Sequence, residues 1–285
     1  MNRLTVPKTY KLFIGGKFPR SESGRVYEVN SPSGEFVANA AQGSRKDLRD
    51  AVVAARAAQP GWSGATAYNR GQVLYRIAEV LEGRKAQFVE EIMLVEGSSA
   101  KEATAQVDAA IDTWIWYAGW ADKYTQVAGQ ANPISGPYFN LSVPEPTGVV
   151  GAIAAQASGS LLGLVATIAP ILVSGNTVVV VPREDAPLTA ISFAEVMATS
   201  DVPGGVVNVI TGSPAELAPW MASHADINAL DLAGAGSLDW ASLQIAAAET
   251  LMRTSSPVEG VPGLSLNRIT TFTEVKTVWH TKSLI

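Results

Sequence analysis

Residues 149–181 read VVGAIAAQASGSLLGLVATIAPILVSGNTVVVV, a stretch with no charged side chain. Two apolar runs of strand length, 149–154 and 177–181, flank a longer apolar run at 161–173. Short β-branched runs that alternate with helix-length runs predict strand–helix–strand units, and strands this apolar must be covered on both faces. We therefore expect two parallel strands joined by a buried helix.

The same alternation continues toward the C-terminus. Further strands are expected at 206–210 and 227–232, with helices at about 188–199, 215–223 and 238–251. Four strand–helix units of this length predict an α/β fold with a doubly wound, Rossmann-like parallel sheet. Such sheets bind ligands at the carboxyl ends of their strands, so candidate site residues are sought there.

The N-terminal part predicts short strands within 10–40, followed by helices at about 44–55, 69–82, 84–95 and 100–124. The last helix carries four large aromatic side chains, Trp114, Trp116, Tyr117 and Trp120. Aromatic side chains so close together on one helix indicate packing in a core or an interface rather than ligand stacking.

The composition narrows the class of protein. Of 285 residues, 47% are apolar and 16% are charged, and the formal net charge is −5 with a pI near 5.2. Without a run of Lys or Arg, this balance argues against nucleic acid or an anionic membrane as a partner. The first residues show no apolar signal segment, and the 161–173 run is shorter than the ~20 residues that span a bilayer, so we expect a cytoplasmic protein.

The chain contains no cysteine and only two histidines, His224 and His280. The lack of cysteine excludes disulfides, zinc–thiolate sites and any thiol nucleophile, and two histidines argue against a histidine-rich metal site. We expect no metal site, and we expect His224 to cap the end of a helix.

Three long motifs and both ends of the chain resemble the aldehyde dehydrogenase superfamily. EPTGVVGAIA (145–154) is similar to the family's first cofactor-domain strand, SGNTVVV (174–180) to its second and PGGVVNVITG (203–212) to its third. The match extends back to FIGG (13–16) and forward to TEVKTVW (273–279), which resembles the C-terminal oligomerisation strand. The resemblance implies a Rossmann-like cofactor-binding domain with a small β oligomerisation element, and NAD(P)-dependent aldehyde oxidation as the family activity.

Mapped onto that family, the chain is expected to divide into five segments. These are the N-terminal helical part of the cofactor-binding domain (1–124), an oligomerisation ribbon (125–144), the Rossmann-like core (145–251), a linker in place of the catalytic domain (252–265), and a C-terminal oligomerisation strand and tail (266–285). A domain of ordinary size has ~100–200 residues, so the linker cannot replace the catalytic domain, and we expect the family's general-base Glu and Cys nucleophile to be missing.

The positions that carry the family's chemistry are altered. In place of Pro-Trp-Asn, whose Asn donates to the oxyanion, the chain has AQA (155–157), and losing one such donor costs on the order of 10²–10³ in rate. In place of the Lys that holds the adenosine ribose it has Val181, although the accompanying Glu is kept as Glu184. The Phe-Thr-Gly-Ser at the pyrophosphate becomes LAGA (232–235).

We therefore expect no catalytic residue, since aldehyde oxidation in the family needs a thiolate. The candidate cofactor contacts are Glu184, Gly212 and Gly234. Glu184 binds a ribose or is a solvated residue at a helix start. The Gly234 turn binds a pyrophosphate through N–H groups at a helix N-terminus or is an ordinary strand–helix turn. Gln156 and Ser158 form a new polar site or belong to a pocket that has simply relaxed.

Three functions remain open. The first is a pseudoenzyme, a non-catalytic structural or regulatory subunit that needs no cofactor and assembles with a full-length aldehyde dehydrogenase homologue or with itself. In the family, the elements matched by 125–144 and 266–282 pair across subunits, and we expect Trp279 and His280 to anchor such a strand. The second is a sensor module that binds NAD or NADP weakly. The third is the supporting half of an active heteromeric aldehyde oxidoreductase; alone, the chain is expected not to be an enzyme.

Overall fold

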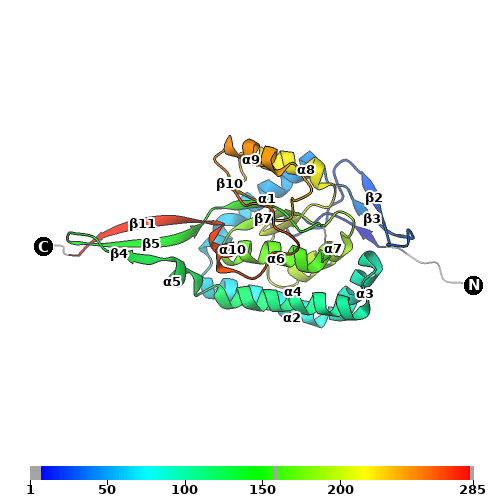
Figure 1. Cartoon of the computed structure of the whole chain (residues 1–285), viewed down its shortest axis with the longest axis horizontal. Helices are drawn as coiled ribbons and strands as arrows, with labels where there is room; N and C mark the ends of the chain where they lie inside the picture. The colour runs from blue at the N-terminus through cyan, green and yellow to red at the C-terminus, as the bar shows by residue number, and fades with distance from the viewer. Residues whose placement is uncertain (1–7, 157–158, 283–285) are drawn as a thin grey trace, which may run out of the picture.

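The computed structural model describes residues 8–156 and 159–282, so Ser158 of the predicted polar site and Ala157 of the AQA segment lie outside the described residues. A layered α/β body carries a narrow β arm that projects from one end (Figure 1). The N-terminal strands lie at the opposite end of the body from the arm (Figure 1).

The body is built on a five-stranded sheet in the order β10-β9-β6-β7-β8, in which every neighbouring pair is parallel. Its strands are β6 (Val149–Ile153), β7 (Thr177–Val181), β8 (Val207–Val209), β9 (Ala229–Asp231) and β10 (Arg253–Thr254). β6 and β7 pair along their whole length and every residue in both is buried, as the uncharged sequence of this stretch requires. The predicted doubly wound, Rossmann-like sheet is confirmed.

Helices cover both faces of this sheet because successive strand side chains point to opposite sides. Val178 and Val180 pack on the side of α6 (Ser160–Val173) and α7 (Leu188–Ala198). Val179 and Val181 pack on the other side, with α1 (Arg45–Gly64), α8 (Pro214–Ala222) and α9 (Trp240–Ala248). None of the described helices is long and apolar enough to cross a membrane.

An outer layer of helices explains why α6 is apolar all round. α2 (Ala67–Gly83), α3 (Lys85–Glu96) and α4 (Ala100–Trp120) pack over it, so α6 is enclosed between them and the sheet. In α4, Trp114 and Tyr117 are fully buried, which confirms their predicted role in packing. Before these helices, β1 (Thr9–Tyr10), β2 (Val26–Asn30) and β3 (Phe36–Ala41) form a small sheet in the order β1-β3-β2.

The arm is a three-stranded antiparallel sheet in the order β11-β5-β4 (Figure 1). It comprises β4 (Gln130–Asn132), β5 (Tyr138–Pro146) and β11 (Thr273–Thr281), with α5 (Tyr124–Ala128) and α10 (Leu266–Thr270) at its base. β5 and β11 pair over nine residues, from Thr273 opposite Pro146 to Thr281 opposite Tyr138. The two distant segments that were expected to form an assembly element are thus one sheet within this chain.

Some predicted boundaries differ from the structure. The ribbon expected at 125–144 begins with a helical turn, and its long strand continues to Pro146. The linker expected at 252–265 begins with β10, which adds a fifth strand to the central sheet because it pairs with β9. The tail expected from 266 starts with α10 before β11.

Candidate functional site

The carboxyl ends of β6, β7, β8 and β9 meet at one edge of the central sheet, where sheets of this kind bind ligands. A cavity of about 410 Å³ lies there, lined by Gln156, Glu184, Asp185, Pro214, Ala215, Ser237 and Leu238. A second cavity of about 260 Å³ lies between α8 and α9 and shares Ala215 and Leu238 with the first. These two adjoining cavities are the candidate cofactor site.

Gln156 ties together the ends of two neighbouring strands. Its side-chain Nε2 donates to the carbonyl oxygens of Ala154, at 2.7 Å, and Pro182, at 3.3 Å. Its Oε1 accepts the backbone N–H of Glu184 at 3.0 Å. The amide is therefore engaged by the backbone after β6 and after β7. Next to it, Ala155 is buried. The position expected to carry the family's oxyanion donor is Ala157, which lies outside the described residues.

Glu184 is exposed and lies at the mouth of the first cavity. Its backbone carbonyl accepts the Tyr27 hydroxyl at 3.1 Å, which fixes the main chain after β7. α7 starts only at Leu188, so Glu184 precedes the helix instead of belonging to its first turn. Val181, at the position of the family's Lys, is fully buried within β7. The carboxylate thus faces the cavity without the cation that accompanies it in the family.

The Gly234 backbone packs directly on β6. Its N–H donates to the carbonyl of Ile153 at 3.1 Å. A Cβ at this position would lie 2.1 Å from the carbonyl oxygen of Ala154, so only glycine fits. The glycine is required here by the close approach of two backbone segments.

The neighbouring N–H groups of this turn are also occupied. Ala233 donates to the Asp231 carboxylate at 3.0 Å, and Ala235 donates to the carbonyl of Leu232 at 2.9 Å. α9 begins only at Trp240. The turn thus differs from the expected cradle of free N–H groups at a helix N-terminus, because consecutive amides bond within the chain and the helix starts further on.

Gly212 lines neither cavity. It has φ +135°, and a Cβ there would lie 3.1 Å from the backbone nitrogen of Gly43. The Gly43 N–H donates to the carbonyl of Thr211 at 2.7 Å. Gly212 therefore allows the turn between β8 and α8 to pack against the segment that follows β3. Of the three predicted cofactor contacts, Glu184 lines a cavity, whereas Gly212 and Gly234 are in the lining of neither.

A buried ion pair at the same edge was missed from the sequence. Asp231 ends β9 with no solvent exposure, and its carboxylate lies 2.5 Å from the Arg268 guanidinium of α10. It also accepts the Ser255 hydroxyl at 2.6 Å. Burial by itself lowers the pKa of Arg268, but the adjacent Asp231 carboxylate holds it above its ordinary value. An Asp within the apolar run INALDL (227–232) is the one sequence signal for this pair.

The electrostatic character of the two cavities is acidic. Their charged lining residues are Glu184, Asp185 and Asp239, and within residues 8–156 and 159–282 no Lys or Arg lines either cavity. Arg183 is adjacent in sequence, but Asp185 binds it at 2.5 Å. Among the described residues, no three His, Asp or Glu side chains lie close enough to hold a metal ion. The site therefore offers acceptors and little positive charge.

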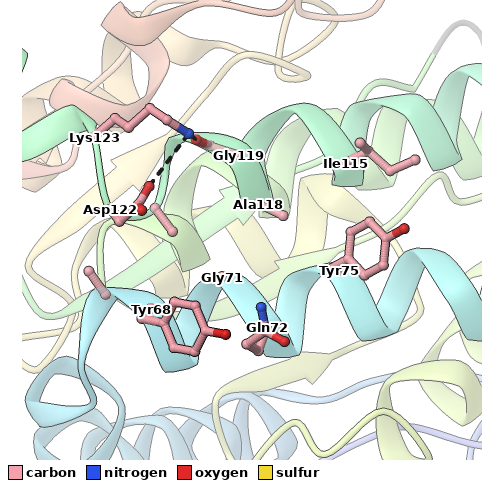
Figure 2. A pocket seen from close by; sticks show the side chains of 11 residues that line it. Tyr68, Gly71, Gln72, Tyr75, Ile115, Ala118, Gly119, Asp122 and Lys123 are labelled. Carbon is pink, nitrogen blue, oxygen red and sulfur yellow. Dashed lines mark hydrogen bonds and ion pairs between the residues drawn. The ribbon is translucent and has the colours of Figure 1, made fainter.

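A separate groove of about 330 Å³ runs between α2 and α4 (Figure 2). Tyr68 and Tyr75 from α2 and Ile115 from α4 line it, and all three side chains are exposed. At one end Asp122 and Lys123 lie 3.6 Å apart, immediately before α5 at the base of the arm (Figure 2). The groove lies on the outer helices, away from the strand ends, and is not part of the candidate cofactor site.

Comparisons with known proteins place the chain in a family. The aldehyde dehydrogenase family model matches residues 18–260. Omega-crystallin of Enteroctopus dofleini is 32% identical over 263 residues, which are 91% of this chain and 52% of that protein. Retinal dehydrogenase 2 of Homo sapiens is 32% identical over 258 residues, 89% of this chain and 49% of that protein.

Solved structures agree with this match. The NAD+ complex of aldehyde dehydrogenase from Bacillus cereus superposes with a TM-score of 0.80 at 27% identity, covering 87% of this chain and 50% of that chain. HpcC from Thermus thermophilus superposes with a TM-score of 0.81 at 30% identity, covering 87% of this chain and 48% of that chain. The chain therefore spans about half the length of the relatives it matches. Since the family match takes in most of this chain, including β10 and the whole candidate site, the chain belongs to the aldehyde dehydrogenase family.

Proposed function

We propose that this chain is an aldehyde dehydrogenase-like pseudoenzyme, a non-catalytic structural subunit that assembles with a full-length aldehyde dehydrogenase homologue or with a second copy of itself. Aldehyde oxidation of the family type proceeds through a thiolate nucleophile, and this polypeptide contains no cysteine. A partner that supplies the Cys and the general-base Glu makes the same subunit the supporting half of an active heteromer. Both cases require assembly.

The observation that carries the proposal is the open strand edge and exposed apolar surface of the arm. β11 is an edge strand of nine residues, and no strand in the described part of the chain pairs with its outer side. The arm also exposes apolar side chains on both long strands, namely Phe139, Leu141, Val143, Val275 and Trp279. A long edge strand with exposed apolar side chains favours pairing with another chain.

The acidic cofactor edge supports the non-catalytic part of the proposal. A dinucleotide carries a negatively charged pyrophosphate, and the cavities offer Glu184, Asp185 and Asp239 without a cation. The Gly234 N–H, a candidate phosphate donor in the sequence, bonds to the carbonyl of Ile153. Losing the ribose-binding Lys alone costs roughly tenfold to a hundredfold in affinity. These features favour an assembly role over a nucleotide sensor.

The decisive experiment is the native mass of the complex recovered with the tagged chain from its own cells, with each component identified by peptide sequencing. A fixed-ratio complex with a cysteine-bearing aldehyde dehydrogenase supports the heteromeric case. A homo-oligomer of the pure chain supports self-assembly. A chain that is recovered alone and sediments as a monomer contradicts the proposal.

A titration of the pure chain with NAD and NADP tests the cofactor edge independently. The seven tryptophans provide a fluorescence signal. We expect no saturable quenching that corresponds to a dissociation constant of about 1 mM or lower. Saturable binding below that value would favour the sensor function, and it would leave the result of the native-mass measurement unaffected.

A further inference from the structure

A third cavity, of about 450 Å³, lies between the start of α1 and the end of α8. Its lining residues are Arg45, Lys46, Leu48, Arg49, Trp220, Ser223 and His224. It shares none of these with the two cavities at the sheet edge, because it uses a different side of α8. Its volume is within the range of small-molecule sites.

The charged lining of this cavity is entirely cationic. Arg45 lies over the Trp220 ring, with its guanidinium carbon 4.1 Å from the ring centroid, and has no ion-pair partner among the described residues. Arg49, one helical turn on, pairs in the described part of the chain only with its exposed neighbour Asp50. Two like charges four residues apart on one helix face repel each other. An anion between Arg45 and Arg49 would relieve that repulsion.

The cations are accessible to a ligand. Lys46 pairs with Glu22 at 3.2 Å, and Arg49 with Asp50 at 2.7 Å, in pairs whose side chains are largely exposed. Exposed pairs of this kind contribute little and are screened by salt, so an incoming dianion can compete with them. Arg45 is held in place by its stacking on Trp220, and its guanidinium donates no hydrogen bond to another described residue.

His224 adds a neutral donor. It follows the end of α8, and its Nδ1 accepts the backbone N–H of Asp226 at 3.2 Å, so it orders the turn rather than capping the helix as expected. Burial lowers the pKa of His224, so the ring is neutral near pH 7. Because Nδ1 accepts, the proton of the neutral ring is assigned to Nε2, where it is a donor.

We propose that this cavity binds a phosphorylated small molecule, with the phosphate on Arg45 and Arg49 and the organic group against the exposed part of Trp220. Guanidinium groups match the geometry of phosphate oxygens and donate to them in pairs. Trp220 is 40% exposed, so part of the ring is open to a ligand. The site rests on these side chains and is independent of the proposed assembly.

The test is calorimetric titration of the full chain with inorganic phosphate and with phenyl phosphate, at constant ionic strength. We expect one site per chain, with phenyl phosphate binding more tightly because only it carries a ring for Trp220. Arg45→Gln and Arg49→Gln should each raise the dissociation constant about tenfold or more. The matched control is Arg76→Gln, which removes an exposed arginine from α2, far along the chain from this cavity.

Two outcomes would overturn the site. One is that neither inorganic phosphate nor phenyl phosphate binds with a dissociation constant of about 10 mM or lower. The other is an equal loss of affinity in Arg45→Gln and Arg76→Gln, which would show binding to overall charge. Trp220→Leu should remove the preference for phenyl phosphate while phosphate still binds. A preference that survives this change would overturn the contact with Trp220. Thermal unfolding of each variant verifies that the fold is retained.

Discussion

The carboxyl edge of the central sheet and the β arm belong to the same chain but differ in how their bonding groups are satisfied. At the edge, Gln156, Gly234 and Asp231 each bond to the chain itself. On the arm, the outer side of β11 has no strand beside it in the described part of the chain, and apolar side chains face solvent. A buried polar group is costly unless it is paired, whereas an exposed strand edge invites a partner.

This difference shows which region satisfies its own hydrogen bonds and which region leaves a strand edge and apolar side chains uncovered. The Asp231 carboxylate at the edge does not need a ligand to satisfy its hydrogen bonds, because the Ser255 hydroxyl, the Arg268 guanidinium and the Ala233 amide already donate to it. In the arm, the strands are hydrogen-bonded to one another, from β4 through β5 to β11. Under the proposed function, the arm is the surface expected to bind a partner, and the edge is a structural part of the body.

The largest effect is expected at the buried pair that completes the edge. Asp231→Asn keeps the side-chain shape but leaves the Arg268 guanidinium buried without its counter-charge. Removing one partner of a buried ion pair costs about 3–5 kcal/mol. Urea unfolding should show this loss of stability. Asp50→Asn, which removes an exposed partner of Arg49, is the control and should cost about 1 kcal/mol or less. Equal costs would mean that the edge is not fastened by this pair.

The next effect should appear in the arm and should change assembly rather than stability. Val275 and Trp279 are 67% and 59% exposed on β11. Placing two carboxylates there with Val275→Asp/Trp279→Asp should weaken association by about 100-fold, since each apolar side chain contributes up to ~1.5–3 kcal/mol when buried. Sedimentation velocity measures the assembly, and thermal unfolding verifies the fold.

Val26→Asp provides the matched control for the arm. Val26 is 52% exposed on β2, an edge strand of the small N-terminal sheet formed by β1, β3 and β2. This variant should keep the mass of the parent assembly. If the double variant on β11 also keeps that mass, the arm is not the assembly surface, and the contrast between arm and edge loses its functional meaning.

The central sheet could be predicted because its pattern is local and strong. The strands β6 and β7 are both runs of β-branched or small residues. The helix between them has the length that a parallel crossover requires. The two long segments of the arm were expected as oligomerisation elements because they resemble known family elements. Their pairing with each other, across more than 120 residues of sequence, is seen only in the structure.

The missed features depend on contacts that leave little trace in the sequence. β10 has two residues, too few for a periodic pattern, and is a strand because it lies beside β9. The Asp231–Arg268 pair joins residues 37 positions apart. Gly234 was a candidate for close approach to a phosphate, but it approaches the backbone of Ala154. A glycine in the sequence indicates a close approach without identifying the neighbouring group.

That close approach gives a smaller, specific effect. Gly234→Ala places a methyl group against the Ala154 carbonyl, and overpacking of this kind costs about 1–3 kcal/mol. Gly119→Ala is the matched control, because Gly119 lies in α4 with nothing within 4 Å of the added Cβ. It should stabilise the chain by about 0.5–1 kcal/mol through helix propensity. Chemical unfolding of both variants measures the difference, and a Gly234→Ala variant as stable as the parent would mean that the edge is open enough to admit a ligand.

The smallest effect concerns the acidic cap of α9, beside the second cavity. The Asp239 carboxylate accepts the Ser242 N–H at 3.2 Å and its hydroxyl at 2.7 Å, and these bonds lower the pKa of Asp239. A carboxyl with a lowered folded pKa stabilises the fold above its unfolded value, 3.8, and loses this effect as the pH falls through the folded value. Asn caps helices about as well as Asp. Asp239→Asn should therefore have a slightly lower urea midpoint at pH 7, and the difference should vanish well below pH 3.8. A deficit that is the same at both pH values would mean that the cap acts through its geometry, and the negative charge at this edge would then play no part in holding α9.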